Sequence, residues 1–181
     1  MKYTITILML LALSRAFAGG VFAADPEANA AATLAVHVPK TDERVTQLRD
    51  FLVFHDSPMA REAGHFVAEA DRLGMDWKLV AAISGVESTF GKHIPGNSYN
   101  AWGWGVFTGA NSGVYFKDWK DGITQVSEGL RYHYIDKGAT TIEAMGRIYA
   151  ASPVWSWKVR FFLDKIEQFV PADPNLLSVT I

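Results

Sequence analysis

The chain has 181 residues, of which 49% are hydrophobic and 20% are charged, so it is long enough to bury the core of one globular domain. Its formal net charge is -2 and no run of Lys or Arg stands out, which argues against an enzyme that must neutralise many nucleic-acid phosphates. The sequence contains no cysteine, which excludes disulfides, thiolate metal sites, a cysteine nucleophile and a lipid-attachment cysteine.

The first residues have the pattern of an export signal. Lys2 provides a positive charge, residues 5–13 form a short apolar stretch, and small residues follow it. Cleavage sites of the expected kind end at Ala18 and at Ala23, and the apolar stretch is too short to span a bilayer. We therefore expect residues 1–23 to be a signal peptide and the mature protein, without a membrane span, to be secreted or to act in the cell envelope. The alternative is an uncleaved membrane anchor.

The next segment, residues 24–40, is rich in alanine and has no apolar period, which predicts a disordered linker. Helical signals begin after it. Thr41 can cap a first helix; Ser57, which precedes a proline, can start a second, and Gly74 can end that second helix.

A third helix and the segment after it differ sharply in composition. Asp76 can cap an apolar helix over residues 77–90, and Gly91 can end it. Residues 92–116 are instead rich in glycine, asparagine and aromatic residues without a helical period, which predicts an irregular insert, with a short β-hairpin as an alternative. Long ordered loops are usually functional, so we expect the site in this insert.

Helical signals return after the insert. Asp118 can cap a helix that ends near Gly138. Thr140 and Glu143 then have the spacing of a capping box, in which each side chain binds a backbone N–H at the start of a helix.

The last expected helix opens at Ser152, which precedes a proline, and runs through about residue 169. The chain thus has about six expected helices around one irregular insert. We expect a mainly α fold, with one domain over residues 41–170 and a C-terminal tail over residues 171–181.

Glu87 carries the clearest chemical signal. On the expected helix it shares a face with Val80 and Ile83, so a carboxylate lies on a core-facing stripe. Desolvation there, together with the partial negative charge of a helix C-terminus, would raise the pKa of Glu87, which suits a general acid. The alternative is a carboxylate at the rim of the core that reaches solvent or a basic partner.

Four segments form an ordered set of motifs around and after this residue: AISGVESTFGK (82–92), SYNAWGWGVF (98–107), FKDWKDGI (116–123) and YAASPVWSWKV (149–159). The set resembles the lysozyme-like superfamily, which includes glucosaminidases, lytic transglycosylases and goose-type lysozymes. The resemblance extends from about residue 57 to residue 169 and is closest to bacterial glucosaminidase domains of the autolysin and flagellar-muramidase kind.

This resemblance implies a lysozyme-like helical domain that contains the aromatic, glycine-rich insert. It implies that Glu87 is the catalytic acid, that Ser88 after it belongs to the substrate site, and that Tyr149 faces the acid. It also implies a hydrolase of the endo-β-N-acetylglucosaminidase type, with the glycan strands of peptidoglycan as its partner and substrate.

A sugar polymer also accounts for the composition of the insert. Trp and Tyr rings offer flat apolar faces to pyranose rings, and Asn side chains hydrogen-bond hydroxyl and acetamido groups. The alternative for each ring is ordinary packing under a glycine-rich loop. Trp155 and Trp157 are expected in the core or in the wall of the groove, where Trp155 would contact the substrate. The expected contacts within the insert are Asn97, Tyr99, Asn100, Trp102 and Trp104.

Glycosidases usually use a second carboxylate. The sequence has no Asp or Glu between Glu87 and Asp118, so the reaction must finish in another way. One route is attack by the substrate itself, through a muramyl 6-hydroxyl or an N-acetyl group. Another uses Asp118, Asp121 or Glu128 as a distant base, although such residues more often cap helices or lie on solvated faces. We expect hydrolysis, with a lytic transglycosylase or a muramidase as alternatives.

Other classes of protein have less support. His55, His65, His93 and His133 do not have the spacing of metal ligands, and there is no nucleotide-binding loop or GxSxG motif, so we expect no metal and no cofactor. Two alternatives stay open: a non-catalytic module that binds cell-wall glycan, and an enzyme that acts on chitin-like chains.

Overall fold

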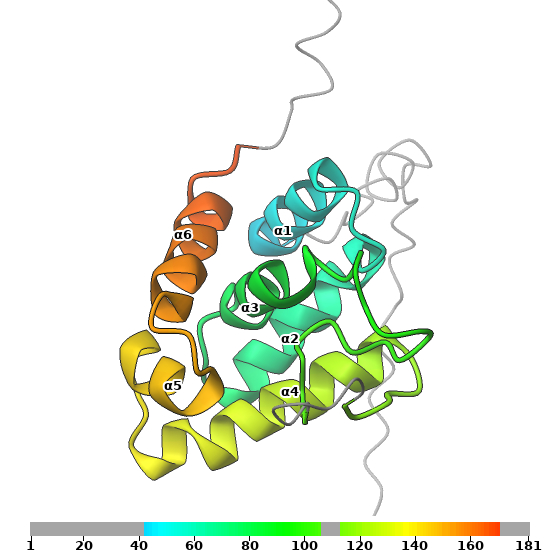
Figure 1. The fold of residues 1–181 in the computed structure, drawn as a ribbon. Coiled ribbons are helices and arrows are strands. Elements are labelled where there is room, and N and C mark those ends of the chain that lie inside the picture. The colour runs from blue at the N-terminus through cyan, green and yellow to red at the C-terminus, as the bar shows by residue number, and fades with distance from the viewer. Residues whose placement is uncertain (1–41, 106–112, 171–181) are drawn as a thin grey trace, which may run out of the picture. The chain divides into compact units, whose positions relative to one another are not determined.

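A computed structural model describes residues 42–105 and 113–170, which form a mainly helical domain without strands (Figure 1). The expected signal peptide, linker and C-terminal tail lie outside these residues, as does the centre of the insert. None of the described helices is long and apolar enough to cross a membrane. The α-helices are α1 (Glu43–Phe54), α2 (Ala63–Leu73), α3 (Leu79–Ser88), α4 (Trp119–His133), α5 (Ile142–Tyr149) and α6 (Trp155–Glu167), and short 3-10 helices cover Ala60–Glu62 and Ile135–Lys137.

Helix α3 is the centre of the domain. It packs against α6 and α4, and Figure 1 shows it at the centre of the view, with α1, α6 and α4 around it. Its residues from Leu79 to Gly85 are all buried, which is the environment that a helix with apolar residues on every side requires. The core around it includes Leu48, Phe51, Phe66, Trp102, Ile123, Leu130, Val159 and Ile166.

Several helix ends follow the sequence signals. Gly74 ends α2 in the left-handed conformation, with φ 62°, and Asp118 caps α4 by accepting the N–H of Asp121 at 2.9 Å. Both predictions are confirmed. The cap of α1 is Asp42, whose carboxylate accepts the N–H of Arg44, so the prediction of Thr41 was wrong by one residue.

The predicted capping box of α5 was also wrong by one residue. Thr141, and not Thr140, caps the helix, because its hydroxyl accepts the N–H of Ala144 at 3.1 Å. The carboxylate of Glu143 instead forms a two-pronged ion pair with Arg160, at 2.6 and 2.7 Å. This pair connects α5 to α6.

Helix α3 is shorter at both ends than the sequence predicts. At its start, Asp76 accepts the N–H of Lys78 at 2.9 Å and holds a turn before the helix. At its end, Thr89, Phe90 and Gly91 have φ values of 54°, 58° and 83°, so three successive residues are left-handed. The chain therefore turns away immediately after Ser88, and the last turn of α3 reaches the surface.

Candidate active site

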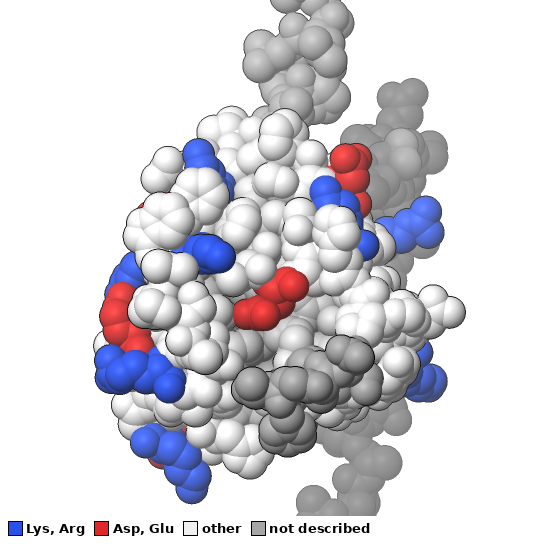
Figure 2. All heavy atoms as spheres, viewed as in Figure 1, with Lys and Arg blue, Asp and Glu red and all other residues white. Residues whose placement is uncertain are grey.

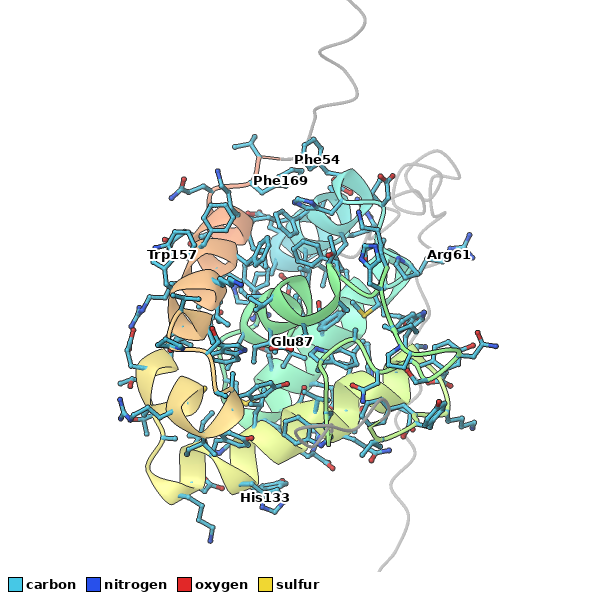
Figure 3. All side chains as sticks on the ribbon, in the orientation of Figure 1. Phe54, Arg61, Glu87, His133, Trp157 and Phe169 are labelled. Atoms are coloured by element: carbon cyan, nitrogen blue, oxygen red, sulfur yellow. The ribbon has the colours of Figure 1, made fainter. Side chains whose placement is uncertain are left out.

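Glu87 lies in the last turn of α3, where that helix emerges from the core. Val80 and Ile83 on the same face are buried, as expected, whereas Glu87 as a whole residue is exposed although protein atoms surround part of its carboxyl group. Figure 3 labels Glu87 near the middle of the visible face, and the space-filling view from the same side shows acidic atoms there with mostly uncharged surface around them (Figure 2). The carboxylate thus stands at the rim of the core with one side open.

The closest partner of the Glu87 carboxyl group is an indole from α6. The Nε1–H of Trp155 donates to Oε1 of Glu87 at 2.6 Å, across 68 residues of sequence. Trp155 is the first residue of α6 and is only 3% exposed. Trp155 is thus a core residue, one of the two places that the sequence predicts for it, and its indole binds the acid; the expected contact with the substrate stays a prediction.

Three influences act on the acidity of Glu87. Burial of the carboxyl group raises its pKa, and this effect outweighs the hydrogen bond from Trp155 and the positive charge of Lys158, which both lower it. The pKa of Glu87 is therefore above that of an ordinary glutamate, in the direction that the sequence predicts. A raised pKa keeps the proton on the group closer to neutral pH, as a general acid requires.

The other carboxyl oxygen of Glu87 faces the backbone of the insert. A Cβ atom placed on Gly103 would lie 3.2 Å from Oε2, and Gly103 has φ 62°, which favours glycine. The short distance and the left-handed backbone thus both favour glycine at residue 103, where the insert passes the acid. The Trp-Gly-Trp motif is visible in the sequence, but no local pattern indicates that its glycine lies against Glu87.

Tyr149 lies beside this arrangement. Its ring stacks on Trp155, with centroids 4.8 Å apart and planes inclined by 24°, and its hydroxyl donates to the carbonyl of Trp102 at 2.6 Å. Burial, then the negative charges of Glu87 and Tyr134, raise the pKa of Tyr149 well above its usual value. Tyr149 is thus a neutral phenol near the acid, which excludes a phenolate nucleophile at neutral pH.

An aromatic pocket of about 380 Å³ adjoins the acid through Gly103 and Tyr149. Trp104, Tyr134 and Tyr149 line it, and their ring centroids are 5.9 to 6.1 Å apart. Trp104 lies directly on α4 at Gly129, where an added Cβ would be 2.2 Å from the indole. Of the predicted sugar contacts, Trp104 is the one that the structure brings to this pocket. Tyr134 and Gly129 were missed because neither stands in the insert.

Ser88 and Trp102, which the sequence assigned to substrate contact, are buried and used within the protein. The hydroxyl of Ser88 donates to the carbonyl of Ala101 at 2.7 Å and accepts the N–H of Gly91 at 2.8 Å. Trp102 is fully buried, and its indole donates to the carbonyl of Val80 at 2.9 Å. Both residues fasten the insert to α3.

Asn100 is also buried, at 3% exposure, and its side chain organises the insert. The amide nitrogen donates to the carbonyls of Trp104 and Val114, at 2.8 and 2.9 Å, and the amide oxygen accepts the N–H of Trp104 at 2.9 Å. These bonds join the two arms of the insert and fix the backbone that carries Trp104. The predicted role in sugar binding would require this side chain to leave its partners.

The remaining aromatic and amide candidates lie elsewhere on the domain. Asn97 is exposed, and Tyr99 is half-buried with its ring edge against Trp119, at a centroid distance of 5.1 Å. Trp157 was expected in the core or groove wall, but it is 65% exposed and stacks on Phe161 on the outer side of α6. The wall prediction for Trp157 was therefore wrong.

The three acids considered as a distant base have structural partners. Asp118 caps α4, Asp121 accepts bonds from the N–H of Lys117 and from Gln125, and Glu128 pairs with Arg72 at 2.9 Å. None of these acids is among the groups that perturb the pKa of Glu87. Residues 106–112, which are not described, contain no Asp or Glu. Among the described residues, no cluster of three or more His, Cys, Asp or Glu could hold a metal ion.

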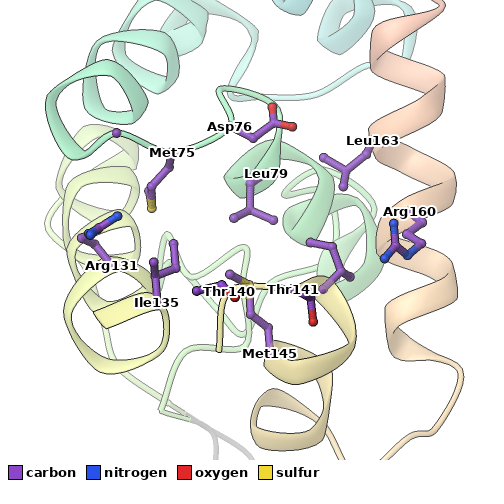
Figure 4. Close-up of a pocket in the computed structure, with 12 residues that line it drawn as sticks. Met75, Asp76, Leu79, Arg131, Ile135, Thr140, Thr141, Met145, Arg160 and Leu163 are labelled. Carbon is purple, nitrogen blue, oxygen red and sulfur yellow. The ribbon is translucent and has the colours of Figure 1, made fainter. Parts of the chain in front are cut away.

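A second pocket, of about 510 Å³, lies at the start of α3 between α4, α5 and α6. Leu79 is part of its apolar floor, and Arg131 and Arg160 lie on opposite sides of it (Figure 4). Each guanidinium already pairs with a carboxylate at 2.6 Å, Arg131 with Asp136 and Arg160 with Glu143. The charged groups of this pocket are thus neutralised by partners of their own.

Comparison with known proteins adds no family: no protein-family model matches the chain, and neither does any curated protein.

Proposed function

We propose that this protein is a lysozyme-like enzyme that cleaves the glycan strands of peptidoglycan, as a hydrolase of the endo-β-N-acetylglucosaminidase type, with Glu87 as the general acid. The observation that carries the proposal is the Glu87 carboxyl group itself. It is open on one side, bound by the Trp155 indole at 2.6 Å on the other, and has a pKa raised by burial. It also adjoins a pocket walled by aromatic rings, the kind of surface that sugars stack on.

The chemical step follows from this arrangement. Glu87 donates its proton to the oxygen of the glycosidic bond, and the electron pair of the breaking C1–O bond goes to that oxygen. The sugar carbon gains positive charge as the bond breaks. In hydrolysis a water oxygen bonds to this carbon and returns a proton to the Glu87 carboxylate, so that the acid is restored and a reducing end is formed.

A lytic transglycosylase is the second candidate, and the surroundings of Glu87 favour it. Burial, Trp155 and Lys158 determine the acidity of Glu87, and among the described residues no second carboxylate contributes. A substrate hydroxyl can then take the place of water: the muramyl 6-hydroxyl bonds to C1, gives its proton to Glu87 and leaves a 1,6-anhydro end. In either case, Tyr149 stays a neutral phenol, and its hydroxyl donates to the carbonyl of Trp102 beside Gly103.

Mass spectrometry of digested sacculi tests the proposal. Reducing N-acetylglucosamine ends support the glucosaminidase, and anhydromuramyl ends support the transglycosylase. Reducing N-acetylmuramic acid ends would identify a muramidase instead. If the protein binds sacculi and releases no fragment, a glycan-binding module replaces the enzyme. Chitooligosaccharides, tested in parallel, reveal whether a chitin-like chain is the better substrate.

The aromatic pocket can be tested apart from the acid. Gly129→Ala places a methyl group where the Trp104 indole now lies, 2.2 Å from its nearest atom, while alanine suits the helix. We expect the indole to swing away and the affinity for glycan fragments to fall by about 10-fold, the loss of one stacking contact. Titration calorimetry in a Glu87→Gln background measures it.

Gly64→Ala is the matched control, because a Cβ on Gly64 of α2 would meet only Val45, at an ordinary 3.8 Å. It should leave the affinity unchanged. If Gly129→Ala and Gly64→Ala bind glycan fragments with equal affinity, Trp104 does not contribute to glycan binding.

A further inference from the structure

We propose that Trp155 is a positioning residue that fixes which oxygen of Glu87 carries the proton: the indole holds Oε1 as an acceptor, so the acidic hydrogen is on Oε2 and is delivered across Gly103. This inference rests on the proposed function for its use in catalysis. The geometry itself can be tested without activity.

The hydrogen-bond donor to Oε1 of Glu87 is the Trp155 indole. An indole Nε1–H can donate a hydrogen bond but cannot accept one. Since Nε1 of Trp155 lies 2.6 Å from Oε1, Oε1 must offer a lone pair in both protonation states. In the protonated carboxyl group the carbonyl oxygen is the stronger acceptor, so this bond favours Oε1 as the carbonyl oxygen and Oε2 as the one that carries the hydrogen.

The insert lies in front of Oε2 of Glu87. The residue that faces this oxygen is Gly103, whose missing side chain would otherwise approach it to 3.2 Å. Gly103 also lines the aromatic pocket, together with Trp104 and Tyr149. On the proposed function, a sugar stacked there has its glycosidic oxygen on the Oε2 side of the carboxyl group.

A chain of contacts links the surroundings of the two carboxyl oxygens of Glu87. Trp155 is 3% exposed and stacks on Tyr149, the hydroxyl of Tyr149 binds the carbonyl of Trp102, and Trp102 is followed by Gly103, which faces Oε2 of Glu87. The contacts close a ring from one oxygen of the carboxyl group to the other. These contacts link the indole at Oε1 to the insert at Oε2, so the two oxygens have different surroundings.

The ring also serves both halves of the reaction. When Oε2 gives up its proton, the indole N–H stabilises the carboxylate that forms; when water or a hydroxyl returns a proton, Oε2 receives it. The charged and titratable groups that face this carboxyl group are Lys158 of α6, whose charge also favours the carboxylate, and Tyr149 of α5, which stays neutral.

Trp155→Phe tests the inference, because it removes the N–H and keeps a ring against Tyr149. The carboxyl carbon of Glu87, observed by NMR in ¹³C-labelled protein, should titrate at higher pH than in the wild type, because a bond that favours the carboxylate is gone. On peptidoglycan, the alkaline limb of the pH–rate profile should move in the same direction. The rate on the acidic plateau should fall about 10- to 100-fold, as for the loss of a hydrogen bond to a charged group.

Trp157→Phe is the matched control. It is the same substitution on the same helix, but Trp157 is 65% exposed on the outer side of α6. It should leave the Glu87 titration and the pH–rate profile unchanged. A Trp155→Phe protein that loses rate while Glu87 titrates as in the wild type would overturn the positioning role, because only packing would then have been lost.

A measurement on the wild type covers the case in which Trp155→Phe does not fold. The chemical shift of the Trp155 indole N–H should change with pH at the midpoint of the Glu87 titration. In Glu87→Gln it should not change over this pH range. An indole N–H chemical shift that does not change as Glu87 titrates would overturn the inference. If the signal follows Glu87 while sacculi stay intact, the positioning holds and the proposed function fails.

Discussion

Glu87→Gln should abolish glycan cleavage, with a loss of about 10³-fold or more in rate on purified sacculi, because an amide cannot donate the proton that the leaving oxygen needs. The fold should persist. The amide oxygen of glutamine can still accept the Trp155 N–H that Oε1 accepts at 2.6 Å, and the shape of the side chain hardly changes.

The same variant should change how stability depends on pH. The pKa of Glu87 is raised in the folded protein, so the unfolded chain gives up this proton at lower pH than the folded one. Wild-type stability therefore falls as pH rises from the unfolded to the folded pKa, and Glu87→Gln should lack this loss. Urea unfolding of both proteins at acidic and neutral pH measures the difference.

Two results would count against the acid. Cleavage by Glu87→Gln at a rate near that of the wild type would mean that another group donates the proton. A variant that unfolds much more easily than the wild type at neutral pH would mean that the Glu87 carboxylate mainly stabilises the fold.

Asn100→Ala should have the largest effect on stability. The substitution leaves the carbonyl of Val114 and the N–H of Trp104 without their side-chain partner in a part-buried region, while the carbonyl of Trp104 keeps the N–H of Val114 at 3.0 Å. Each buried group left unpaired costs about 1–3 kcal/mol, so we expect a loss of about 2 kcal/mol or more in the free energy of unfolding. Urea denaturation measures it as a lower midpoint with an unchanged slope.

Asn97→Ala is the control for this prediction, since Asn97 is in the same insert and exposed. A surface change of this kind should alter stability by no more than about 0.5 kcal/mol. If Asn100→Ala instead keeps its stability and loses affinity for glycan, Asn100 contacts the sugar as the sequence suggested, and its bonds within the insert matter little.

Local signals in the sequence predicted the scaffold well. Gly74 and Asp118 end and start helices through their own backbone and side-chain geometry, which needs no knowledge of the rest of the fold. The failures were also local. Thr140 and Thr141 are chemically equal as caps, and the expected second half of the capping box, Glu143, instead pairs with Arg160 of another helix.

The directions of the side chains in the insert could not be predicted from the sequence. Asn97 and Asn100 look alike in a polar, glycine-rich sequence, yet one is exposed and the other is buried among backbone groups. The direction in which a loop side chain points depends on the packing of the whole loop, which has no period to read. The contact between Trp155 and Glu87 was hidden for the same reason, since 68 residues separate the two.

The separation of Glu87 and Trp155 by 68 residues also affects the properties of Glu87 during folding. The helix that carries Glu87 can form from local contacts, but Trp155 reaches the acid only when α6 docks on α3, and distant contacts of this kind form late in folding. Until then Glu87 is an ordinary solvated glutamate with an ordinary affinity for its proton. On the proposed function, the enzyme becomes competent to cleave glycan only once α6 is in place.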